Sequence, residues 1–177
     1  EIYGDINNWD VSRITDFSNL FRNQTTFNSD ISNWNVSKGT RFDYMFYNAS
    51  SFNQNISKWD VTNIERLGLG AMFYNASAFN QDISEWDVSK NKDFTFMFRG
   101  ANSFNQDISK WNVSAGTDFT GMFQDARSFN QDIGLWNVSS SGWFWYMFSG
   151  ASSFNQDISS WIVDEKDKLT DMFDGAN

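Results

Sequence analysis

The sequence predicts an α/β repeat solenoid, a leucine-rich-repeat-like, right-handed array of about seven coils with a short parallel sheet on one side and short helices on the other. Three observations predict this fold. Tryptophan recurs every 25 residues, with one spacing of 27, along a chain of 177 residues. The segment 103–114 (SFNQDISKWNVS) recurs almost unchanged in most coils. Aromatic residues make up 19% of the chain, and so many rings need an organised interior.

Residues 1–177 are predicted to form one repeat domain. A propeller blade needs about 40 residues, whereas a period of 25 residues is enough for one coil of a solenoid. Each coil is expected to start near a tryptophan, namely Trp9, Trp34, Trp59, Trp86, Trp111, Trp136 and Trp161. Both ends of the chain cut through a repeat, so we expect a fragment of a longer array.

The segment 108–113 is expected to form the strand of its coil. Ile108, Trp111 and Val113 are apolar, with polar residues between them. The alternation of Trp111 and Val113 is typical of a half-buried strand. Stacking one such strand per coil produces the predicted parallel sheet.

The segment 117–126 is expected to form the helix of its coil. Phe119, Met122, Phe123 and Ala126 follow the spacing i, i+3, i+4, i+7, which places them on one face of a helix. The serine before this segment is a candidate N-cap in three coils, at Ser89, Ser114 and Ser139.

The third coil contains an insertion. Its segment 63–72 carries two extra residues and two glycines before the Met-Phe pair. Insertions in a solenoid form a bulge on one face, often the binding face. We favour a neutral surface loop over such a binding bulge.

The pattern Met-Phe-x-x-Ala-x-x-Phe-Asn-Gln-Asp-Ile-Ser-x-Trp-Asp-Val-Ser covers essentially the whole chain. It resembles the bacterial surface-protein repeat of about 26 residues known from mycoplasma and Listeria lipoproteins, a relative of the BspA-like leucine-rich repeats. This resemblance implies a leucine-rich-repeat-like fold, an extracellular location on a cell surface, and roles in adhesion and antigenic variation.

The composition argues against catalysis. The chain has no Cys and no His, which removes the thiolate nucleophile and the commonest general base. Its recurring acids lie in identical surroundings, whereas paired catalytic carboxylates need unlike ones. The net charge of −9 disfavours nucleic acid and anionic membrane surfaces as partners. No apolar run approaches about 18 residues, so direct membrane insertion is not expected.

No cofactor is expected, with Ca²⁺ as a weak alternative. Carboxylates stacked beside Asn and Gln are the oxygen ligands that Ca²⁺ prefers. The candidates are Asp82, Asp107, Asp132 and Asp157. However, the Phe-Asn-Gln-Asp unit lies at a predicted turn, where Asn and Asp side chains bond to their own backbone. We favour this turn, with its amides satisfied by a ladder of Asn28, Asn53, Asn80, Asn105, Asn130 and Asn155.

The candidate site is the outer face of the predicted helices, where the chain does not repeat itself. Large rings and arginines stand there although a solvated helix face normally carries Lys, Glu, Ser and Asn, and such side chains are the usual interface anchors. Tyr44, Phe96 and Tyr146 alternate with Ala71 and Gly121, which predicts aromatic ridges separated by hollows. The candidate partner-binding residues are Arg41, Asp43, Tyr44, Tyr47, Phe96, Arg99, Gln124, Trp143, Trp145 and Tyr146.

These observations predict a non-catalytic surface recognition or adhesion module that binds a protein or cell-surface receptor through this face. Glycan binding by the same rings is one alternative, and a structural spacer that holds another domain away from a cell surface is a second. The rings could also pack against a further domain, or belong to the core.

Overall fold

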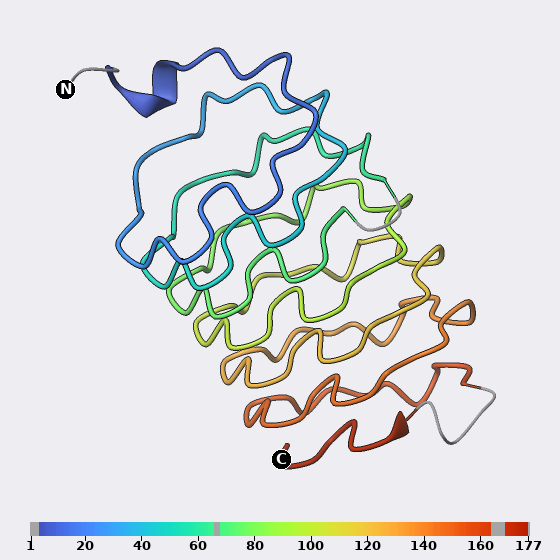
Figure 1. The fold of residues 1–177 in the computed structure, drawn as a ribbon. Coiled ribbons are helices and arrows are strands. Elements are labelled where there is room, and N and C mark those ends of the chain that lie inside the picture. Colours follow the sequence, from blue (N-terminus) through green and yellow to red (C-terminus); the bar gives the residue numbers. More distant parts are fainter. Residues whose placement is uncertain (1–3, 66–67, 164–168, 177) are drawn as a thin grey trace.

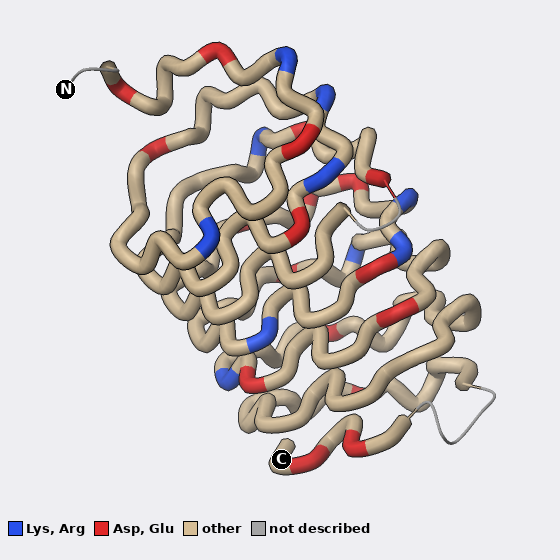
Figure 2. The backbone as a smooth tube through the Cα atoms, in the orientation of Figure 1, with Lys and Arg blue, Asp and Glu red and all other residues tan. Residues whose placement is uncertain are grey.

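The computed structural model describes residues 4–65, 68–163 and 169–176. The chain winds through a stack of coils, so that residues one period apart lie side by side (Figure 1). Backbone hydrogen bonds join neighbouring coils, as between the N–H of Phe46 and the carbonyl of Met72, at 2.9 Å. Charged residues lie along the coils throughout the stack (Figure 2).

The predicted α/β solenoid with a sheet and helices is wrong. The one complete helix in the described ranges is the short 3₁₀ helix η1 (Ile6–Asn8), whose N-terminus is capped by the side chain of Asp5. These ranges contain no α-helix and no sheet. Their only β-pairings are isolated parallel bridges, Asp16 with Arg41, Asp93 with Asp118, and Asp118 with Trp143. The coils consist of turns joined by segments without regular secondary structure.

The segment expected to be helical is instead a succession of turns. An α-helix needs every N–H to bond the carbonyl four residues back. In the segment 94–101 the N–H groups alternate: that of Phe96 donates to the next coil, whereas that of Met97 donates to Phe94, three residues back. Phe96 and Gly100 have φ angles of 53° and 67°, as the third residue of a type II turn requires. We call this arrangement, which recurs in every coil, the turn ladder.

The burial predicted from the helical spacing is nevertheless correct. Phe94, Met97, Phe98 and Ala101 each have no exposed surface. Two left-handed residues, four positions apart, turn the chain back so that the same four side chains point inward. The spacing i, i+3, i+4, i+7 is therefore shared by a helix face and this turn ladder.

The segment expected to be a strand is also built from turns. The N–H of Trp111 donates to the carbonyl of Ile108, and that of Gly116 donates to Val113. Ser114 is not a helix cap, because its N–H donates to Oδ1 of Asn112, 3.2 Å away; Ser89 and Ser139 take the same turn with Asp87 and Asn137. Contact between coils here runs through indole groups, since Nε1 of Trp111 donates to the carbonyl of Ile83 at 3.0 Å.

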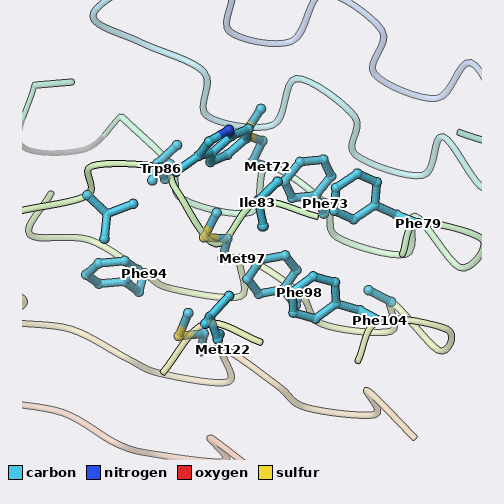
Figure 3. Packing of buried hydrophobic residues seen from close by; sticks show 14 of the residues in the cluster. Met72, Phe73, Phe79, Ile83, Trp86, Phe94, Met97, Phe98, Phe104 and Met122 are labelled. Atoms are coloured by element: carbon cyan, nitrogen blue, oxygen red, sulfur yellow. The ribbon is translucent and has the colours of Figure 1, made fainter. Parts of the chain in front are cut away.

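Aromatic rings fill the interior in ladders that run along the stack (Figure 3). Phe73 stacks on Phe98 of the next coil with ring centroids 5.6 Å apart, and Phe79 stacks on Phe104 at 6.0 Å. Within one coil, the rings of Phe98 and Phe104 are 4.0 Å apart. Offset stacking of this kind adds to the hydrophobic gain of burying each ring.

The insertion in the third coil leaves the core in register. Leu69 occupies the place of the phenylalanines Phe42 and Phe94 and is fully buried. The N–H of Phe42 donates to the carbonyl of Gly68, so pairing with the second coil is restored at that residue. Residues 66–67 of the segment 63–72, which carries the predicted insertion, lie outside the described residues.

We expect Trp111→Phe to lower the free energy of unfolding by about 1–3 kcal/mol, because it removes buried volume and one hydrogen bond to Ile83. The measurement is urea unfolding followed by circular dichroism. Asn112→Asp is the matched control, since Asp87 accepts the same turn bond from Ser89 in the preceding coil. Equal stability of Trp111→Phe and the wild type would contradict the role given to the indole.

Candidate functional site

The outward side of the turn ladder is here called the turn face. It contains the first of the two left-handed residues of each coil. These residues have φ angles between 51° and 60°: Asn19, Tyr44, Ala71, Phe96, Gly121, Tyr146 and Asp171. Such angles suit Gly and Asn, whereas a bulky side chain there is an outlier. Three of the predicted site residues, Tyr44, Phe96 and Tyr146, therefore stand at strained positions.

Four side chains of successive coils form a continuous column on the turn face, Arg22–Tyr47–Tyr74–Arg99. The guanidinium of Arg22 lies 4.9 Å from the centroid of the Tyr47 ring. The Tyr47 and Tyr74 rings stack at 4.4 Å, and the guanidinium of Arg99 lies 5.2 Å from the Tyr74 ring. Arg22 and Tyr74 were not predicted as site residues. Aligning the coils position by position, with Arg22 and Tyr74 in the place of Tyr47 and Arg99, would have found them.

The rings beside this column are covered by its arginines. Arg22 lies 5.3 Å from the Tyr44 ring, and Arg99 lies 5.3 Å from the Phe96 ring. The hollow predicted at Gly121 is filled, because a Cβ atom there would lie 2.4 Å from the Phe96 ring. Gln124 also lies beside Gly121.

A second aromatic group lies further along the turn face. The Trp143 and Trp145 rings are 4.6 Å apart and tilted by 59°. Their exposed fractions are 44% and 38%, and that of Tyr146 is 39%, whereas the core Trp111 is 3% exposed. The structure thus confirms that these three rings lie outside the core.

Arg41 and Asp43 are not free surface groups. Asp43 is buried, and both of its carboxylate oxygens accept hydrogen bonds from Arg41, at 3.1 and 2.9 Å. A third nitrogen of Arg41 pairs with Asp16 at 3.3 Å. The guanidinium of Arg41, which was expected to contact a partner, is therefore held in a bidentate pair with Asp43.

Asp93 lies in a hollow between the two strained rings Tyr44 and Phe96. The hollow has a volume of about 190 Å³, and Gly70 is also part of its lining. Oδ1 of Asp93 accepts the N–H of Thr95 at 2.8 Å. Burial raises the pKa of the Asp93 carboxyl, and the charges of Asp118 and Asp43 raise this pKa further.

The recurring aspartates close turns, as the favoured interpretation predicts. Asp107 Oδ1 accepts the N–H of Ser109 at 2.9 Å, and these bonds to Ser109 lower the pKa of Asp107. Asp82, Asp132 and Asp157, the other candidate Ca²⁺ ligands, accept from Ser84, Gly134 and Ser159 in the same way. The asparagine ladder is present too: the N–H of Asn105 donates to Asn80 Oδ1 at 2.9 Å. Within the described residues, no three His, Cys, Asp or Glu side chains group as a metal site requires.

Two aspartates are expected to give opposite pH dependences. A raised folded-state pKa means that the folded protein holds the Asp93 proton more tightly, so this group favours folding at low pH and loses that effect as pH rises through its folded pKa. Asp93→Asn should therefore gain stability relative to the wild type from pH 3 to pH 7. Asp107 has a lowered pKa, so Asp107→Asn should lose stability relative to the wild type over the same range. Urea unfolding at several pH values measures both, and slopes of the same sign would contradict these assignments.

The chain was compared with known proteins. A family model described as "Mycoplasma protein of unknown function, DUF285" matches residues 1–101 and again residues 69–177. A search of curated proteins and a search of solved structures found no match. In the described residues, no helix has the length and apolar character needed to cross a membrane. Because the two matches together span the whole sequence, the chain belongs to the mycoplasma repeat family DUF285.

Proposed function

We propose that this chain is a non-catalytic recognition module that binds a protein on a cell surface through its turn face. The observation that carries the proposal is the placement of Tyr44, Phe96 and Tyr146 at left-handed backbone positions. A left-handed conformation costs a residue with a Cβ roughly 1–2 kcal/mol. Gly121 occupies the same position in another coil, so the fold does not need a ring there. Three rings that reduce stability without filling the core are best explained by a ligand that they contact.

The extent of the turn face fits a protein partner. Tyr44 and Tyr146 are four coils apart, and coils joined by backbone hydrogen bonds are spaced by about 4.8 Å, so the two rings are separated by roughly 20 Å. A specific protein interface buries about 800 Å² on each side and depends on a few Trp, Tyr and Arg anchors. Among the described residues, Lys and Arg are scattered along the coils in Figure 2 and form no basic strip of the kind that a nucleic acid would require.

Glycan binding is the second candidate function, and one observation favours it at a single place. A sugar ring stacks on an open aromatic face. In the column Arg22–Tyr47–Tyr74–Arg99, the neighbouring side chains already cover those faces. The exposed Trp143–Trp145 pair is the better place for such stacking.

The proposed recognition module also includes three properties that the resemblance implies. These are an extracellular location, a role in adhesion and a relation to the BspA-like leucine-rich repeats.

The variant Tyr146→Gly tests whether this ring reduces the stability of the fold. Because glycine adopts a positive φ without steric cost, we expect unfolding to require about 0.5–1 kcal/mol more free energy than in the wild type. Urea unfolding measures this, and Ala151→Gly in the same coil is the control that should destabilise, since Ala151 is fully buried. A loss of more than about 1 kcal/mol in Tyr146→Gly would show that the ring has a structural role.

The double variant Trp143→Ala/Trp145→Ala tests the binding function. Binding of the labelled protein to host cells, to a membrane-protein array and to a glycan array should weaken at least about tenfold, because Trp side chains are typical interface anchors. Leu135→Ala is the matched control, since Leu135 is 91% exposed and lies outside the turn face. Unchanged binding of the double variant would favour the spacer, and a loss confined to the glycan array would favour the glycan.

A further inference from the structure

The hollow between Tyr44 and Phe96 combines three features. It is walled by two aromatic rings, its lining includes the glycine Gly70, and it contains the partly buried carboxylate of Asp93. A Cβ atom at Gly70 would lie 3.1 Å from Oδ2 of Asp93, so this glycine keeps the space above the carboxylate open.

In the part of the chain that the structure describes, no ion pair gives Asp93 a counter-ion. Arg41 also lines this hollow, but its guanidinium is bound to Asp43 and Asp16. Lys92 lines the neighbouring hollow, together with Asp118, and no ion pair joins it to Asp93 in the described residues. Two further guanidiniums lie nearby, because Arg22 is over the Tyr44 ring and Arg99 is over the Phe96 ring. None of these cations forms an ion pair with Asp93 in the described residues.

We propose that this hollow binds a lysine side chain of the protein partner, with its ammonium group between the Tyr44 and Phe96 rings and against Oδ2 of Asp93. The inference rests on the proposed function, since it names the chemistry of the same partner. Aromatic faces attract cations within about 6 Å, and a carboxylate that is partly removed from water gains most from an added positive charge.

The hydrogen bonds of Asp93 select lysine over arginine and over a metal ion. Oδ1 is occupied by the N–H of Thr95, so one oxygen is left for a ligand. The planar fork of arginine binds best to two carboxylate oxygens, as Arg41 does with Asp43, whereas an ammonium is a point charge that one oxygen can hold. Ca²⁺ needs six or more oxygen ligands, and aromatic walls do not provide them.

Butylammonium is the probe for this site, because it reproduces the end of a lysine side chain. Its addition to the ¹⁵N-labelled protein should shift the amide resonance of Thr95 saturably, with a dissociation constant of roughly 1–30 mM. Neutral 1-butanol should shift this resonance at least tenfold less at the same concentration. Equal effects of butylammonium and butanol, or tenfold tighter binding of butylguanidinium, would overturn the inference.

Asp93→Asn is the decisive variant. It keeps an oxygen for the N–H of Thr95, as Asn112 does for Ser114, and removes only the charge. We expect at least tenfold weaker butylammonium binding, whereas Asp107→Asn, at a distant turn, should bind as the wild type does. The amide spectrum of each variant reports its fold. Unchanged binding to Asp93→Asn would overturn the inference, and the comparison of butylammonium with butanol on the wild type tests it even if the variant does not fold.

This experiment is independent of the test of the proposed function. If the Trp143→Ala/Trp145→Ala variant loses partner binding and butylammonium does not bind the wild type, only the lysine site is overturned. If butylammonium binds and the double variant still binds its partners, only the proposed recognition role of the tryptophans is overturned.

Discussion

The structure depends on how the backbone N–H groups of the turn ladder are divided. Every second N–H closes a turn within its own coil, and the others donate to the next coil, as Phe96 and Phe98 do. This division requires a left-handed residue every four positions, which explains the Gly, Asn and Asp residues that recur there. It also gives a reason why the chain has no proline, since each ladder N–H is either a turn donor or a link between coils.

The opposite side of each coil is held by side chains. The indole of Trp111 donates to the backbone carbonyl of Ile83 in the preceding coil, and the side-chain oxygen of Asn80 accepts the N–H of Asn105 in the next coil. The same two bonds recur in neighbouring coils, as from Trp136 to Ile108 and from Asn130 to Asn105. A change in one coil therefore disturbs two contacts, with the coil before and the coil after. The near-identity of the Ser-Phe-Asn-Gln-Asp-Ile-Ser-x-Trp segments follows from this reciprocity, so the most repetitive part of the sequence is structural.

Sequence reasoning found the buried residues and the turn-forming aspartates because both depend on local spacing and side-chain chemistry. It failed on secondary structure because Phe94, Met97, Phe98 and Ala101 face inward both in a helix and in the turn ladder. A positive φ distinguishes the turn ladder from a helix. The sequence indicates it only through the small or polar residues at positions such as Asn48 and Gly100. The burial of Asp43 and the contacts of Arg22 with Tyr47 depend on neighbouring coils, so spacing within one coil could not reveal them.

The same backbone explains how one fold can present a varied surface. The bonds between coils on this side use mainly backbone atoms, so a side chain at a left-handed position can change without altering how the coils pair. The conformational cost of a ring there is about 1–2 kcal/mol. A good anchor residue contributes 2 kcal/mol or more to binding. A ring that acts as an anchor on the turn face, as proposed, would therefore add more to the free energy of binding than it removes from the stability of its own coil.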